Sequence, residues 1–210
     1  MRKLLIAVMV AVLAACGAVP ERPIRDQEAE LNAKDLCCED LKAISYEPLV
    51  PKTPTQVVLD SSALARQFPI GRSYFKAFSI SSEGIQGIWF RSYFNGLFIK
   101  QFLQPMVLFL DADHKPVGVN APYTQFTEGN LFGDQNARME GGLRVPPNTK
   151  YLLVFTAKFT DAPDPVRTAP STGALLMGNT PVVTTNPGKT IALERSMTGE
   201  LILELVSIPK

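Results

Sequence analysis

The single histidine, His114, lies in a segment whose residue types occur in metal sites and catalytic triads. The segment reads Asp111-Ala112-Asp113-His114-Lys115-Pro116, and an Asp-x-Asp spacing offers hard oxygen ligands to a cation. A calcium loop of the helical type also needs a glycine, further ligands and a distal glutamate, which are missing here. Aspartate and proline also favour a β-turn that leads into a new strand. We therefore expect a turn, with Asp111 and Asp113 as weak candidates for a metal site.

The rest of the sequence offers little for catalysis. A serine triad would have to use His114, and no Gly-x-Ser-x-Gly elbow is present. Zinc hydrolysis takes about three protein ligands, which one histidine and the neighbouring Cys37 and Cys38 supply poorly. Acidic residues are plentiful, but no pair stands out as suited to glycoside cleavage. We expect a protein without catalytic activity and without a cofactor.

The segment from Ile88 to Tyr93 is the strongest candidate for a binding surface. In a β-strand with its even-numbered residues toward the core, Trp89, Arg91 and Tyr93 share the opposite face. Sugar rings present apolar C–H faces that pack on aromatic rings, and arginine donates hydrogen bonds to hydroxyl groups. The same residue types dominate protein interfaces. The alternative is that a loop covers this face and that the aromatic side chains belong to the core.

The N-terminus has the composition of an export signal. Arg2 and Lys3 precede an apolar run of about ten residues, too short for a bilayer that needs about 20. The Leu-Ala-Ala-Cys that follows resembles the lipobox of bacterial lipoproteins, in which the cysteine is lipidated and becomes the first mature residue. We expect residues 1–15 to be a signal peptide and Cys16 the lipidation site; the alternative is an ordinary cleaved signal. In bacterial lipoproteins an aspartate directly after the lipidated cysteine favours retention at the inner membrane. Because this position is Gly17, the resemblance implies that the protein is anchored in the outer membrane and faces the periplasm.

Charge and cysteine content narrow the partners. Removal of the signal lowers the basic residues from 21 to 19 against 20 acidic ones, so the mature net charge is −1. Without a basic patch we expect neither nucleic acid nor electrostatic membrane binding. Adjacent cysteines have Cα atoms about 3.8 Å apart, short of the roughly 4.4–6.8 Å that disulfides prefer. A bridge between Cys37 and Cys38 is therefore expected to be strained, and two thiols or a bridge to another chain are the alternatives.

The elements that must position these residues begin with an N-terminal connection. We expect residues 16–35 to form the lipidated cysteine and a tether, because residues 17–34 are rich in charge and proline and lack an apolar stripe. Residues 36–210 are expected to form one domain. Asp35 to Ala43 is predicted to be a short helix, capped by Asp35, with Cys37, Leu41 and Ile44 on one face.

Beyond this helix the apolar residues alternate as in strands. The segments predicted to be strands are 57–59, 74–79, 88–93, 106–110, 116–119, one that ends with Leu143 and Val145, 151–156 and 201–206. Turn signals such as Pro146-Pro147-Asn148-Thr149 and the lack of long helices predict a mainly β fold, an antiparallel, jelly-roll-like β-sandwich with a short N-terminal helix. The stretch from Asp161 to Thr190 resists this scheme and reads as a long functional or mobile connection, in which Ser171 to Met177 is predicted to form a helical turn.

Several landmarks together resemble one family. They are Ile44-Ser45-Tyr46-Glu47-Pro48-Leu49, Val107-Leu108-Phe109-Leu110-Asp111, Met139-Glu140-Gly141, Leu143-Arg144-Val145-Pro146, Tyr151-Leu152-Leu153-Val154-Phe155-Thr156, Gly178-Asn179-Thr180-Pro181 and Gly199-Glu200-Leu201-Ile202-Leu203. In this order, over roughly residues 36–207, they resemble the maltose-operon periplasmic protein (MalM-type) family. The resemblance implies an exported, largely β domain associated with maltose or maltodextrin systems, in a lipoprotein member that lacks the C-terminal helical tail.

These observations favour a non-catalytic, periplasm-facing lipoprotein. The expected function is a carbohydrate-binding or carbohydrate-uptake accessory module, with Trp89, Arg91 and Tyr93 as ligand-binding residues. The alternative is an envelope protein that binds another protein, through this surface or through the stretch from Asp161 to Thr190. A polar groove beside Trp89 favours the sugar interpretation, and a broad exposed apolar patch favours the protein partner.

Overall fold

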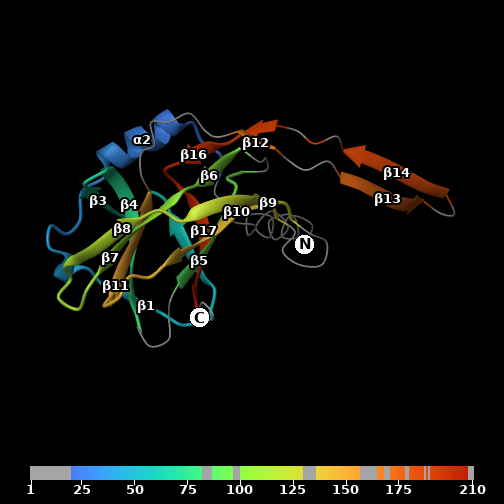
Figure 1. Cartoon of the computed structure of the whole chain (residues 1–210). Helices are drawn as coiled ribbons and strands as arrows, with labels where there is room; N and C mark the ends of the chain where they lie inside the picture. Colours follow the sequence, from blue (N-terminus) through green and yellow to red (C-terminus); the bar gives the residue numbers. More distant parts are fainter. Residues whose placement is uncertain are drawn as a thin grey trace, which may run out of the picture.

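Two β-sheets packed face to face make up the body of the protein, which confirms the predicted mainly β sandwich. The computed structural model describes residues 20–81, 87–96, 100–129, 136–156, 165–167, 171–177, 180–186, 188 and 190–207 (Figure 1). The expected signal peptide and Cys16 lie outside these residues. Within the described ranges, no helix is long and apolar enough to cross a membrane.

The first sheet has the strand order β1-β4-β11-β7-β8, with β3 also paired to β4. Its strands are β1 (Glu47–Leu49), β3 (Leu64–Phe68), β4 (Gly71–Ile80), β7 (Pro105–Leu110), β8 (Pro116–Asn120) and β11 (Tyr151–Thr156). Apart from the parallel β1–β4 pair, these strands are antiparallel. The central strands β4, β7 and β11 bury side chains on both faces, and such strands have nearly continuous apolar sequences.

The second sheet has the order β2-β17-β5-β10-β9 and is antiparallel throughout. Its strands are β2 (Thr55–Leu59), β5 (Gly87–Tyr93), β9 (Tyr123–Thr127), β10 (Arg138–Arg144) and β17 (Gly199–Val206). In β17 every second residue is buried, because only one face of this sheet meets the core. The opposite face is therefore available for contact with other molecules.

The main core lies between the two sheets. Its largest buried side chains include Tyr74 and Phe109 from the first sheet and Phe90 from the second. A second apolar cluster lies on the outer face of the first sheet, around Phe75 and Phe155. This outer cluster is covered in part by the chain from Cys37 to Tyr46, so the first sheet is sandwiched between two apolar layers.

The predicted helix from Asp35 to Ala43 is wrong in position and extent. Only Leu41–Ala43 is helical, as the single 3₁₀ turn η1, and Asp40 rather than Asp35 caps it by accepting a hydrogen bond from the Lys42 amide at 2.9 Å. The preceding residues instead run alongside β3, where Leu36 bridges Ala65 and the Cys37 amide donates to the Ala65 carbonyl at 2.7 Å. Pairing with a strand replaces the helical hydrogen bonds that the apolar spacing suggested.

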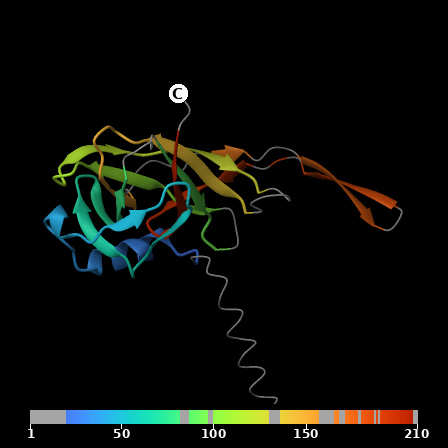
Figure 2. The ribbon, with the colours of Figure 1, turned by 90° about the horizontal axis from the view of Figure 1, so that it is seen from below.

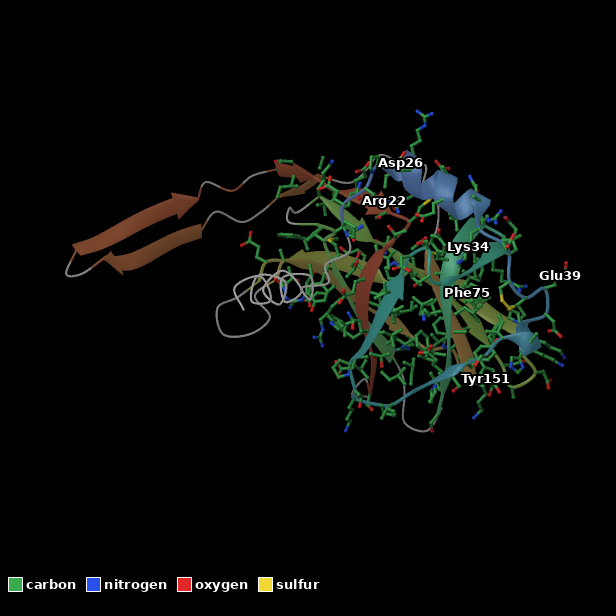
Figure 3. The ribbon with its side chains drawn as sticks, turned by 180° about the vertical axis from the view of Figure 1, so that it is seen from behind. Arg22, Asp26, Lys34, Glu39, Phe75 and Tyr151 are labelled. Carbon is green, nitrogen blue, oxygen red and sulfur yellow. A yellow bond between two sulfur atoms is a disulfide. The ribbon has the colours of Figure 1, made fainter. Side chains whose placement is uncertain are left out.

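The α-helix of the described residues, α2 (Ile24–Ala33), lies in the segment that was expected to be a tether. Arg22 precedes the helix, Asp26 lies in its first turn, Lys34 follows its last residue, and Glu39 lies on the loop beyond (Figure 3). Leu31 belongs to the main core and is 2% exposed, while Gln27 is completely buried. One apolar and one amide side chain thus dock a helix whose sequence shows no sustained apolar stripe.

Strand pairs outside the two sheets complete the described part of the chain. They are β6 (Gln101–Leu103) with β16 (Glu194–Ser196), β12 (Pro165–Arg167) with β15 (Thr190–Ala192), and β13 (Ser171–Met177) with β14 (Thr180–Asn186). The predicted helical turn at Ser171 to Met177 is wrong, because these residues pair antiparallel with β14 in continuous register. The β13–β14 hairpin projects away from the body in both views of the ribbon (Figures 1 and 2).

Candidate functional site

Strand β5 presents the predicted binding residues on the outer face of the second sheet. Trp89 is 38% exposed, and Arg91 and Tyr93 are partly exposed, whereas Ile88 and Phe90 are buried in the core. The predicted alternation therefore holds along the strand, and the alternative in which a loop buries Trp89 as a core side chain does not fit. We call Trp89, Arg91 and Tyr93, together with Tyr123, Gly142 and Glu204 on the neighbouring strands, the β5 platform.

A second exposed aromatic residue lies in register with Trp89. On the neighbouring strand Gly142 pairs with Trp89, and one strand further Gly142 pairs with Tyr123, which is 77% exposed. A Cβ atom added at Gly142 would lie 3.1 Å from Cε3 of the indole, so the indole extends over this glycine. The absence of a side chain at Gly142 leaves room for the ring and opens the row from Trp89 to Tyr123.

Polar and charged side chains surround this aromatic row. The Arg91 guanidinium forms a 3.0 Å ion pair with Glu204, whose backbone is in register with Trp89 on the other side of β5. In the next row, Glu140 accepts hydrogen bonds from Arg138 Nε at 3.0 Å and from Thr127 Oγ1 at 2.8 Å. These bonds fix acceptors and donors around the rings without covering Trp89 or Tyr123.

The segment around His114 forms the turn between β7 and β8. Asp111 Oδ1 accepts hydrogen bonds from the backbone amides of Asp113 and Lys115, at 2.8 and 2.9 Å. His114 adopts a left-handed backbone conformation, with φ of 63°, and its ring stacks on Tyr151 at 4.2 Å. The Asp111 carboxylate thus stabilises the turn by accepting backbone hydrogen bonds. Among the described residues, no cluster of three or more metal-ligating side chains is present.

Tyr46 completes an aromatic group with His114 and Tyr151. Its ring centroid lies 4.6 Å from that of Tyr151 and 5.3 Å from that of His114. Its hydroxyl donates a 2.8 Å hydrogen bond to the Leu41 carbonyl. Burial, reinforced by the neighbouring Tyr151 phenol, raises the pKa of Tyr46 to about 12. These contacts hold the covering chain against the first sheet, a structural role.

Cys37 and Cys38 are joined to each other by a disulfide, the first of the three arrangements considered from the sequence. Both residues pack against the outer apolar cluster of the first sheet. Cys38 has a positive φ of 57°, a conformation uncommon for residues other than glycine. The disulfide lies in the covering chain, and the β5 platform is on the other sheet.

Comparison with known proteins leaves the chain without an established relative. No protein-family model, no curated protein and no solved structure matches it. The resemblance to the maltose-operon periplasmic family therefore stays a prediction that rests on the motifs quoted above.

Sequence reasoning found the β5 half of the platform and missed the rest. Tyr123, Glu204 and Gly142 lie on three other strands, and only the sheet order β17-β5-β10-β9 brings them together. A signal was present for Gly142, since a glycine inside a strand often marks a close approach of another group. Nothing in one sequence indicates which strand that approach comes from.

Proposed function

We propose that the protein is a non-catalytic, lipid-anchored carbohydrate-binding module that uses the β5 platform. The row of Trp89 and Tyr123 across the side-chain-free Gly142 is the observation that carries this proposal. Adjacent strands are about 4.8 Å apart, so the two aromatic residues stand roughly 10 Å apart along the sheet. Such a row suits an extended ligand with several apolar ring faces, such as a linear oligosaccharide.

The polar surroundings favour a sugar over a protein interface. Arg91, Glu204 and Gln125 flank the rings and supply donors and acceptors for hydroxyl groups. A protein partner of ordinary affinity is expected to need a wider apolar centre. Along the described outer face of the second sheet, the exposed large hydrophobic side chains are those of Trp89 and Tyr123, too few for such a centre.

Location and family resemblance suggest the class of sugar. Lipidation at Cys16 would hold the module at the periplasmic face of the outer membrane. The resemblance to the maltose-operon family points to maltose and maltodextrins, and an accessory role in carbohydrate uptake would follow from binding without hydrolysis. The module would then concentrate oligosaccharides near the membrane.

A second candidate function rests on the projecting hairpin. An isolated two-stranded hairpin is marginally stable in water, and β13–β14 extends from the body without a third strand paired to it among the described residues. Contact with another envelope protein would stabilise it. This alternative uses a region separate from the β5 platform, so the two functions are distinguishable by where variants act.

Calorimetric titration of the purified chain with maltodextrins of increasing length and with unrelated glycans tests the first proposal. We expect binding that strengthens with chain length until both aromatic residues are covered, and no release of reducing ends. Absence of affinity for every glycan would reject the sugar function. Co-purification of one envelope protein that is lost on deletion of residues 171–186 would then support the second candidate.

A further inference from the structure

An apolar pocket opens on the other sheet, away from the β5 platform. Its volume is about 570 Å³, within the range of small-molecule sites. The walls come from β3, β7, β8, β11 and the covering chain, through Phe68, Leu108, Val119, Phe155 and Leu41. The rings of Phe68 and Phe155 stack at 3.9 Å, nearly parallel, and form a flat apolar wall. Such a lining suits a hydrocarbon chain.

The rim of the pocket exposes further apolar side chains. Ile70 is 43% exposed and Val119 is 42% exposed, and both line the pocket. Val119 belongs to β8, an edge strand of the first sheet, so one side of the opening lies at the edge of the sheet. A ligand can therefore enter from solvent without separation of the two sheets.

One cation, Arg66, lies in this mainly apolar lining, whose other polar side chain is that of Gln67. Arg66 Nη2 donates a 2.9 Å hydrogen bond to the Glu39 carbonyl, on the loop marked in Figure 3. Arg66 Nη1 is buried and has no hydrogen-bond partner among the described residues. A buried donor without an acceptor is costly, and more so when it is charged. Arg66 is the charged side chain of the pocket lining, so an anionic group in the pocket would be the natural partner for its guanidinium.

We propose that this pocket binds a long-chain fatty acid, with its hydrocarbon chain along Phe68 and Phe155 and its carboxylate at Arg66. A carboxylate matches the planar fork of a guanidinium and balances its charge. The apolar walls account for the chain, and the single cation accounts for the head group. The site is independent of the proposed sugar function, since it uses the opposite sheet.

Photo-crosslinking of the lipidated protein in phosphatidylcholine vesicles tests this proposal. The probe is palmitic acid with a diazirine in its chain, and peptide mass mapping locates the adducts. We expect saturable adducts on residues 68–70 and 116–119 that unlabelled palmitate displaces. The matching fatty alcohol should label the same peptides at least tenfold less, because a hydrogen bond to a charged group typically contributes a factor of ten or more.

Two variants and one control separate the head-group contact from simple partition into an apolar surface. Arg66→Met should lower the labelling by fatty acid at least tenfold, and Val119→Trp, at an exposed position, should block entry. Arg25→Met, which removes an exposed arginine on α2, should change nothing. Three results would overturn the proposal. The first is equal labelling by the fatty acid and the fatty alcohol, and the second is labelling that Arg66→Met leaves unaffected in a variant with unchanged circular dichroism. The third is labelling of the pocket by diazirine phosphatidylcholine instead of the fatty acid.

Discussion

Replacement of Gln27 by methionine tests how helix α2 is held to the two β-sheets. Gln27 Oε1 accepts hydrogen bonds from the Met197 amide at 3.0 Å, the Thr198 amide at 3.2 Å and the Ser196 hydroxyl at 2.8 Å. Its Nε2 donates to the Arg22 carbonyl at 2.8 Å. Methionine keeps the length of the side chain and removes these bonds. The substitution therefore isolates hydrogen bonding from packing.

The expected loss follows from the donors that remain. The Thr198 amide keeps a second acceptor, Ser196 Oγ at 3.3 Å, but the Met197 amide has no other acceptor among the described residues. One orphaned buried donor costs about 1–3 kcal/mol, and the lost side-chain bonds add about 1 kcal/mol. We expect destabilisation of about 3 kcal/mol, which lowers Tm by roughly 6–12 °C for a domain of this size.

Thermal unfolding followed by circular dichroism measures this loss, and hydrogen exchange over residues 24–33 shows whether α2 detaches first. Gln56→Met is the matched control, because Gln56 is exposed and bonds only to Glu200 at 2.8 Å in the described contacts. Its effect should stay within about 0.5 kcal/mol. Equal Tm values for the two variants would refute the view that Gln27 docks the helix.

Two further predictions concern the anchor and the covering chain. Cys16→Ser should abolish lipidation, because a hydroxyl does not replace the thiolate nucleophile, and the protein should leave the membrane fraction; unchanged partition, or no acyl mass on Cys16 of the parent, would contradict this. Tyr46→Phe should reduce alkaline destabilisation. Because the folded-state pKa of Tyr46 is about 12 and its ordinary value is 10.0, the folded state retains a proton that the unfolded chain loses, so stability falls as pH rises from about 10 to 12. Denaturant unfolding of the parent and of Tyr46→Phe at pH 8 and at pH 11 measures how far the free energy of unfolding falls in each protein. An equal fall in both proteins would refute this role of Tyr46.

The sequence predicted eight of the strands in the described residues and missed the others. The eight were found because their patterns follow directly from burial. Alternation identified β5 and β17, and continuous apolar runs identified β7 and β11, which are buried on both faces. The turn at residues 146–149 also holds, with Asn148 at a positive φ of 63°. These elements depend on local pattern, which one sequence contains.

The elements that were missed depend on distant partners. Helix α2 has no apolar stripe because one of its two buried side chains is that of Gln27. The Gln27 side-chain oxygen accepts hydrogen bonds from residues about 170 positions further along the chain. The chain from Leu36 pairs with β3 and so does not form the helix that its spacing suggested. The pairing of Tyr123 with the platform likewise depends on sheet order, which no local pattern encodes.

The most direct test of the proposed sugar function is Trp89→Ala, with binding and stability measured on the same protein. Trp89 is 38% exposed, so its loss should shift Tm by only a few degrees, whereas a core tryptophan would cost about 3–5 kcal/mol. Affinity for the best maltodextrin should fall at least tenfold, and Leu64→Ala, a change at a 48% exposed position on the other sheet, should leave affinity unaltered. A large drop in Tm, or unchanged affinity in Trp89→Ala, would contradict the assignment of the β5 platform as the carbohydrate site.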